Sequence, residues 1–186
     1  MEAYEAGQRI FGENKIQEMT EKQEQMPQDV AWHMIGHVQT NKVKYMAPYV
    51  SLIHSVDRLK LIKEINKQGK KIDRVIDVLI QVKIAKEDSK FGMPVPDAVA
   101  LFENNTLANY PYLRVKGLMG MATFTDNDDQ VEAEFELLEG LYLRFRESAS
   151  LTILSSGMSG DYKLAIANGS TMVRMGSSIF GPRNYD

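Results

Sequence analysis

The sequence contains no cysteine, which excludes disulfide bonds and thiolate chemistry. It also lacks an excess of basic residues, because 22 lysines and arginines stand against 25 aspartates and glutamates, for a net charge of −3. A nucleic acid partner is therefore not expected, since such proteins usually present a basic surface. No apolar run reaches transmembrane length, and the first residues lack the pattern of a signal peptide. We expect a cytoplasmic protein with no membrane partner.

The chain has the composition of one ordinary globular domain, since 44% of its 186 residues are hydrophobic. Short apolar runs alternate with segments of helical periodicity, which indicates an α/β fold with a parallel sheet. One helix is predicted around Leu59 and Ile65, and another should start at the capping pair Asp129 and Glu132 and extend to Phe145. Seven strands are predicted, near residues 9–12, 31–35, 50–54, 75–84, 115–121, 151–154 and 171–175.

The stretch from Leu151 to Gly181 is the most informative part of the sequence. Two predicted strands lie in it, and each is followed by small residues, SSGMSG after the first and GSS after the second. Asp161 then opens a helix that ends at Asn168-Gly169. Loops of this kind leave backbone N–H groups unshielded and let an anion approach closely. Two of them after consecutive strands predict a phosphate site; the alternative is that glycine and serine only form turns.

Arg174 is a charged residue in the last predicted strand. Strand alternation places Arg174 on one face with Met172 and Gly176, and both faces of a barrel strand are covered. A buried guanidinium is costly without partners, so we expect a ligand or an acidic neighbour beside it. The alternative is an arginine at the end of a strand that reaches solvent.

GMSGDY followed by GSTMVRMGSSIFG resembles the signature of the pyridoxal 5′-phosphate homeostasis proteins, whose fold is similar to the barrel domain of alanine racemase. The resemblance implies a (β/α)8 TIM barrel and pyridoxal 5′-phosphate (PLP) as cofactor. It also implies that Arg174 faces the pyridine nitrogen. The residues that the resemblance places around the phosphate come from the two loops, and they are Ser156, Gly157, Ser159, Gly176 and Ser177. A serine stands at 156 where the family often has methionine, and at 177 where it often has threonine.

Three further segments resemble family motifs and are expected to line the cofactor cavity. They contribute Asn14 from FGEN, His37 from WHMIGHVQTNK and Met119 from GLMGMA, while the segment from Ser89 to Gly92 resembles a loop at the cavity mouth. Asn14 is alternatively the cap of the next helix. His33 and His37 have the spacing of a metal pair on a helix, but the segment fits a strand end better and no third ligand cluster is evident, so no metal site is predicted.

The seven predicted units are one short of a complete barrel. The resemblance implies that the first βα unit, with the lysine that forms the Schiff base, would lie upstream of Met1. A truncated piece of a longer protein is the preferred hypothesis, and a natural short form with a rearranged fold is the rival. Lys83, near the end of a predicted strand, is the alternative attachment point, although a lysine there more often reaches solvent.

The resemblance implies a protein that binds PLP in its intracellular homeostasis and has no turnover of its own, so no catalytic residue is assigned. An arginine at the pyridine nitrogen fits this role, because guanidinium accepts no proton and makes the cofactor a weaker electron sink. A racemase-like enzyme, or another barrel enzyme with a phosphorylated ligand, is the alternative. We expect a monomer in which residues 1–186 form a single PLP-binding domain, with PLP-requiring apoenzymes as further partners.

Overall fold

The computed structural model describes residues 1–87 and 90–181 and contains the predicted parallel sheet. Its seven strands pair in the order β1 to β7, each with its neighbour in sequence, and every pairing is parallel. They are β1 (Ile10–Glu13), β2 (Ala31–Met34), β3 (Leu52–Val56), β4 (Ile76–Gln81), β5 (Leu113–Met119), β6 (Ile153–Met158) and β7 (Met172–Arg174). All seven predicted strands are confirmed, and the sheet is a nearly closed barrel of the expected class.

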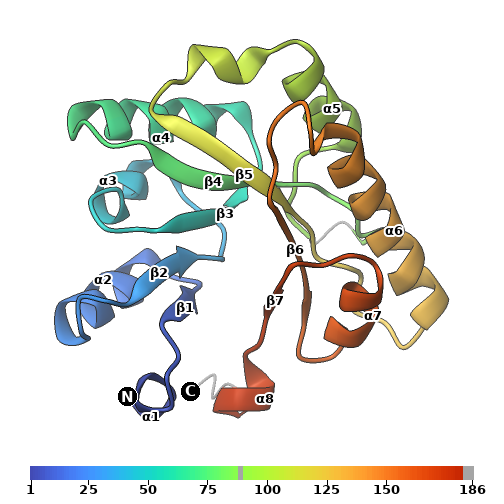
Figure 1. The fold of residues 1–186 in the computed structure, drawn as a ribbon, viewed down its shortest axis with the longest axis horizontal. Coiled ribbons are helices and arrows are strands. Elements are labelled where there is room, and N and C mark those ends of the chain that lie inside the picture. The colour runs from blue at the N-terminus through green and yellow to red at the C-terminus, as the bar shows by residue number, and fades with distance from the viewer. Residues whose placement is uncertain (88–89, 182–186) are drawn as a thin grey trace.

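The helices between the strands lie on the outer side of the curved sheet, while one short helix precedes β1 and another follows β7 (Figure 1). They are α1 (Glu2–Glu5), α2 (Ile16–Gln25), η1 (Thr40–Lys42), α3 (Val43–Met46), α4 (Leu59–Lys71), α5 (Val95–Glu103), η2 (Thr106–Asn109), α6 (Asp128–Phe145), α7 (Tyr162–Ala167) and α8 (Ser177–Phe180). In the part of the chain that the structure describes, no helix is both long and apolar enough to cross a membrane.

The two long helices bury the apolar residues that the sequence predicts, except Leu59, which begins α4 and is 40% exposed. In α4, Leu61, Ile62 and Ile65 are buried against the sheet. In α6 the whole stripe is buried, and it comprises Val131, Phe135, Leu138, Tyr142 and Phe145. The predicted cap of α6 is wrong by two residues, because the side chain of Asn127 accepts the hydrogen bond from the backbone N–H of Gln130 at 3.2 Å.

Strand alternation divides the core into two regions. The larger region lies between the sheet and the helices, whereas a small cluster of Leu52, Leu79 and Met119 lies on the inner side of the barrel. Met121, Ile153 and Met172 pack against this inner cluster and are partly buried. The inside of the barrel is therefore a packed apolar layer rather than a channel.

Two strands, β4 and β6, end three or more residues from the predicted position, and both differences move a loop. β4 ends at Gln81 rather than at Ile84, and Val82, whose backbone N–H still donates to Met119 of β5, forms an isolated bridge to Met93 before α5. β6 continues to Met158 rather than ending at Leu154, because its two serines are buried, with 0% and 1% of Ser155 and Ser156 exposed. The loop between β6 and α7 is accordingly shorter than the sequence suggests.

Candidate functional site

A polar layer lies directly above the inner apolar layer, toward the carboxyl ends of the strands. Each strand of this layer carries a polar residue two positions after an inner apolar residue, on the same strand face. The pairs are Leu52 and His54 in β3, Ile153 and Ser155 in β6, and Met172 and Arg174 in β7. Because ligands of parallel α/β barrels bind at the carboxyl ends of the strands, this polar layer is the floor of the candidate site.

Arg174 is held in this floor by two hydrogen bonds. Its Nη1 donates to the Oγ of Ser155 at 2.8 Å, and its Nη2 donates to the backbone oxygen of Gly120 at 3.0 Å. Burial lowers the pKa of Arg174 to about 10, against the opposing effect of Asp161, so the guanidinium stays charged at neutral pH. Of its five N–H groups, the other three have no acceptor among the described residues. Both acceptors are neutral oxygens, and Asp161 is an acidic neighbour only through its charge, so the ligand expected beside Arg174 stays a prediction.

The two small-residue loops meet at one atom. The Oγ of Ser159, after β6, accepts hydrogen bonds from the backbone N–H groups of Gly176 and Ser178, after β7, at 3.2 and 3.3 Å. No heavy atom lies within 4 Å of a Cβ built at Gly160 or Gly176, so the surface beside both loops is open. Backbone N–H groups that converge on one oxygen in an open position are suited to an oxyanion.

The other predicted phosphate residues of this region have different places. Ser177 is exposed and is the first residue of α8. Gly157 is buried with φ +88°, and a Cβ there would lie 2.5 Å from the Cβ of Ala165, so its glycine lets α7 pack against β6. Ser156 lies within β6, where its backbone oxygen accepts from the Oγ of Ser170 at 2.9 Å. Ser156 and Gly157 therefore support the base of the loop, and their contact with phosphate stays a prediction.

The remaining predicted residues lie at the same end of the barrel without joining the loops. Asn14 follows β1, and the cap of α2 is Lys15 instead, so the capping alternative for Asn14 is wrong. The Nδ1 of His37 lies 3.2 Å from a carboxylate oxygen of Asp57, and its ring stacks on Phe91 at 4.2 Å. No hydrogen bond or ion pair within the described residues links Asn14 or His37 to Arg174 or to Ser159.

Met119 is the last residue of β5 and lies in the inner apolar layer. The next residue, Gly120, has the backbone oxygen that accepts a hydrogen bond from Arg174. The neighbouring Gly120 packs outward, since a Cβ there would lie 2.7 Å from Ile84 and 2.8 Å from Leu138. Close packing thus explains this glycine. In the segment that resembles a mouth loop, Phe91 and Gly92 are described, whereas Ser89 lies outside the described residues.

Two residues of the floor escaped the sequence analysis. His54 and Ser155 are fully buried, and the Nδ1 of His54 lies 3.1 Å from the Oγ of Ser155. The Nε2 of His54 lies 3.0 Å from the Nδ1 of His33, so His33 pairs with His54 and not with His37. For His54 the available signal was a histidine inside the apolar run LIHSV, and for Ser155 it was a serine directly after the apolar run LTIL, since buried polar side chains require partners.

Burial keeps both histidines neutral. It lowers the pKa of His33 to about 4. Burial also lowers the pKa of His54 well below its ordinary value, and the nearby His33 and Arg174 lower it further. The floor of the site therefore carries one positive charge, that of Arg174.

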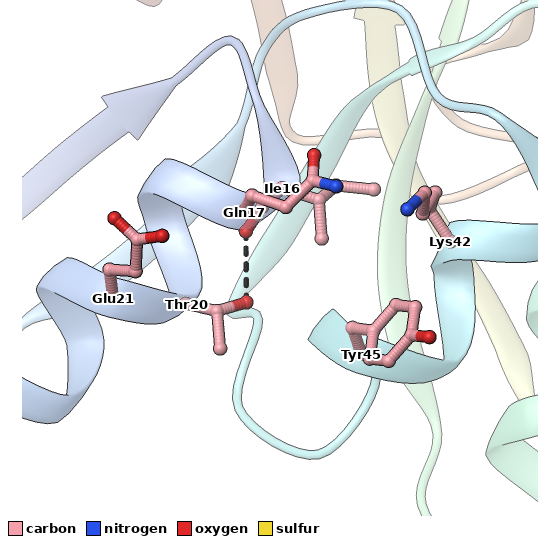
Figure 2. A pocket seen from close by; sticks show the side chains of 6 residues that line it. All are labelled: Ile16, Gln17, Thr20, Glu21, Lys42 and Tyr45. Atoms are coloured by element: carbon pink, nitrogen blue, oxygen red, sulfur yellow. Dashed lines mark hydrogen bonds between the residues drawn. The ribbon is translucent and has the colours of Figure 1, made fainter.

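A hollow lies on the outside of the barrel (Figure 2). It measures about 320 Å³ and is lined by side chains from α2, η1 and α3, which are Ile16, Gln17, Thr20, Glu21, Lys42 and Tyr45. None of the predicted cofactor residues lines it, so the strand ends remain the candidate site.

Comparison with known families agrees with this geometry. Residues 1–184 match the family described as "Alanine racemase, N-terminal domain". Alanine racemase from Clostridium difficile is 13% identical, with a TM-score of 0.74 over 98% of this chain and 47% of that one, which shows the shared fold alone. The class of the protein is thus a barrel of the alanine racemase N-terminal type.

Closer relatives identify the family within this class. A pyridoxal phosphate homeostasis protein from Aquifex aeolicus is 40% identical over 99% of this chain and 81% of its own length. The protein of the same name from Escherichia coli is 36% identical over 99% of this chain and 80% of its own length. PipY of Synechococcus elongatus, solved with PLP bound, has a TM-score of 0.85 and 33% identity over 97% of this chain and 85% of that chain. The chain belongs to the family of pyridoxal phosphate homeostasis proteins.

Proposed function

We propose that this protein binds pyridoxal 5′-phosphate at the floor and the two loops described above, and that it serves PLP homeostasis without turnover of its own. The names of the relatives and the PLP bound to PipY support this function. The observation that carries it is Arg174, a half-buried cation with three N–H donors that have no acceptor among the described residues, two residues before a loop whose backbone N–H groups converge on one oxygen. A ligand with an anionic group and an acceptor atom on a ring would satisfy both features.

The phosphate end is assigned to the loops. Ser159, Gly176 and Ser177 bind the phosphate through hydroxyl and backbone N–H groups, in the way that glycine-rich loops bind anions without lysine. The N–H groups of Gly176 and Ser178 already converge on one oxygen, that of Ser159, so little rearrangement of the backbone is needed. Ser156 and Gly157 contribute by fixing the strand end from which the loop leaves.

The ring end is assigned to Arg174. PLP supplies an electrophilic aldehyde and a pyridine ring whose nitrogen can draw electrons from an attached group. A guanidinium donates a hydrogen bond to that nitrogen but is too weak an acid to protonate it, which limits the electron-withdrawing power of the ring. Asn14, His37 and Met119 line the same end of the barrel and restrict the space around the ring. This arrangement favours holding the cofactor over reacting with it.

The proposal also covers the oligomeric state, the cell compartment and the partners of the protein. Residues 1–186 act as a single binding domain, as a monomer in the cytoplasm. Free PLP and PLP-requiring apoenzymes are its partners. Sedimentation of the protein with and without PLP tests the monomer, and transfer of PLP to an apoenzyme, faster than from solution, tests delivery.

Titration with three ligands tests the site assignment. PLP, inorganic phosphate and unphosphorylated pyridoxal are titrated into the protein and into Ser159→Ala and Arg174→Lys variants. Ser159→Ala should weaken PLP and phosphate alike by about tenfold, and Arg174→Lys should weaken PLP and pyridoxal but spare phosphate. Tyr49→Phe is the control, because its hydroxyl contacts Thr20 away from the barrel interior. Unchanged PLP affinity in both site variants would refute the assignment.

Two further measurements test the absence of turnover and the mode of attachment. Alanine incubated with the protein and PLP in deuterium oxide should keep its α-proton at the rate seen without protein, and faster exchange would favour the racemase-like alternative. Borohydride reduction of the PLP mixture, with peptide mapping, should give no single labelled lysine in this chain. A unique label on Lys83 would show a covalent attachment point there.

A further inference from the structure

Four side chains from four strands form one continuous line through the floor of the site. His33 of β2 contacts His54 of β3 at 3.0 Å, His54 contacts Ser155 of β6 at 3.1 Å, and Ser155 accepts from Arg174 of β7 at 2.8 Å. His33 is 8% exposed, and His54 and Ser155 are both 1% exposed or less. The line therefore runs from the protein interior to the one cation of the site.

The numbers of donors and acceptors in these side chains determine which way the hydrogen bonds of this line point. Each neutral histidine has one N–H donor and one acceptor nitrogen, and the serine hydroxyl has one hydrogen to donate. With Arg174 as a donor to Ser155, the hydroxyl can donate to the Nδ1 of His54, and the Nε2–H of His54 can donate to the Nδ1 of His33. Every hydrogen between two members of the line then has an acceptor, and the one left over is the Nε2–H of His33, which belongs to the most exposed of the three neutral side chains. The opposite assignment leaves the hydroxyl hydrogen of Ser155 with no acceptor in this cluster.

The electrostatics favour the same direction. A donor that points away from a cation is polarised by it, and each bond of such a chain strengthens the next. The histidines stay neutral because burial lowers both of their pKa values. The line thus anchors the guanidinium through neutral groups and does not cancel its charge, as a carboxylate partner would.

We infer that Ser155, His54 and His33 form a one-way hydrogen-bond relay that positions Arg174 for the ring nitrogen of the cofactor. The inference rests on the proposed function, and it assigns these three as positioning residues that act through Arg174. The relay and the bond to Gly120 hold two different nitrogens of the guanidinium, which fixes the orientation of its plane. The three remaining N–H groups of Arg174 are thereby given fixed directions.

The first test uses the protein without any ligand. Nitrogen-15 NMR of the imidazole rings at pH 7.5 should show unprotonated Nδ1 and protonated Nε2 in both His33 and His54. In the Ser155→Ala variant the Nδ1 of His54 loses its donor, and its shift should move toward that of an unbonded nitrogen. A protonated Nδ1 on His54 in the unsubstituted protein would overturn the direction of the relay.

The second test separates positioning from mere stability through ligand selectivity. Affinities are compared for PLP, for inorganic phosphate and for a PLP analogue with carbon in place of the ring nitrogen. Ser155→Ala and His54→Phe should weaken PLP by about tenfold and leave phosphate and the ring-carbon analogue unchanged. Ser159→Ala should weaken all three, and the Tyr49→Phe control none.

The outcomes distinguish this inference from the proposed function. An equal loss for all three ligands in Ser155→Ala would reduce the relay to a structural role and overturn the inference. If His54→Phe does not fold, Ser155→Ala decides the result, because it removes a single buried oxygen. No PLP binding by the unsubstituted protein would overturn the proposed function, while the imidazole nitrogen shifts would still decide the relay.

Discussion

The buried histidine pair should make the stability of this protein fall steeply in mild acid. His33 is 8% exposed, and its pKa is lowered to about 4 in the folded protein, against an ordinary value of 6.5. Because the folded-state pKa is the lower one, the unfolded chain takes up the proton first as the pH falls. The contribution of His33 to stability is therefore complete above pH 6.5 and is lost progressively toward pH 4.

The two pKa values set the size of the effect. From pH 7.5 to pH 5, His33 alone should remove about 2 kcal/mol from the free energy of unfolding, and about 3 kcal/mol by pH 4. Protonation of His54 should add to this loss in the same direction, since its pKa is lowered as well. A loss of this size is a large fraction of the stability of a typical domain.

Urea unfolding at a series of pH values measures this loss directly. The free energies of unfolding of the protein and of His33→Gln are compared, so that titration of distant groups cancels. The difference between the two should shrink by about 2 kcal/mol between pH 7.5 and pH 5. Tyr49→Phe is the matched control, because it removes a hydrogen bond of a group that does not titrate in this range, and its difference should stay constant. A constant difference for His33→Gln, or an NMR titration midpoint of His33 near 6.5, would refute the reasoning.

Two further predictions concern the loops around the site. Gly157→Ala should lower the free energy of unfolding by about 2 kcal/mol, because the new Cβ would meet Ala165 at 2.5 Å and φ is +88°. Thermal unfolding measures this, with Gly160→Ala, which meets no atom within 4 Å, as control. Glu134→Gln should cost about 2 kcal/mol, because its buried carboxylate accepts hydrogen bonds from the backbone N–H and hydroxyl of Thr123, each at 2.7 Å. Burial raises the pKa of Glu134, but these hydrogen bonds outweigh it and lower the pKa, so the difference from Glu134→Gln should diminish as the pH falls below 4.5.

The sequence predicts the strands and long helices well because their signals are local. Apolar runs and 3.6-residue stripes are properties of consecutive residues, and the sheet follows from their alternation. The helix cap and the end of β6 were misplaced because local signals do not decide them. Asp129 and Asn127 are both good caps by residue type, and two buried serines extend a strand only when a partner such as Ser170 satisfies the backbone.

The floor of the site could be predicted only in part. Arg174 stood out because a charged residue in a covered strand requires an explanation, and the loop residues stood out through a motif. The relay gave no comparable signal, since His54 and Ser155 are 101 residues apart in sequence and meet only when the sheet curls. The barrel, rather than any motif, brings these side chains within hydrogen-bond distance.

The hydroxyl of Ser159 already occupies the backbone donors that are proposed to receive the phosphate. Capture of a ligand oxygen by those donors is then an exchange of one acceptor for another, and the hydroxyl of Ser159 is left to donate its own hydrogen to the ligand. An exchange of this kind yields a smaller net gain than a first bond, and it keeps the ligand-free loops from collapsing or unfolding. The same side chain that holds the two loops together also supplies the acceptor that replaces a departing ligand oxygen.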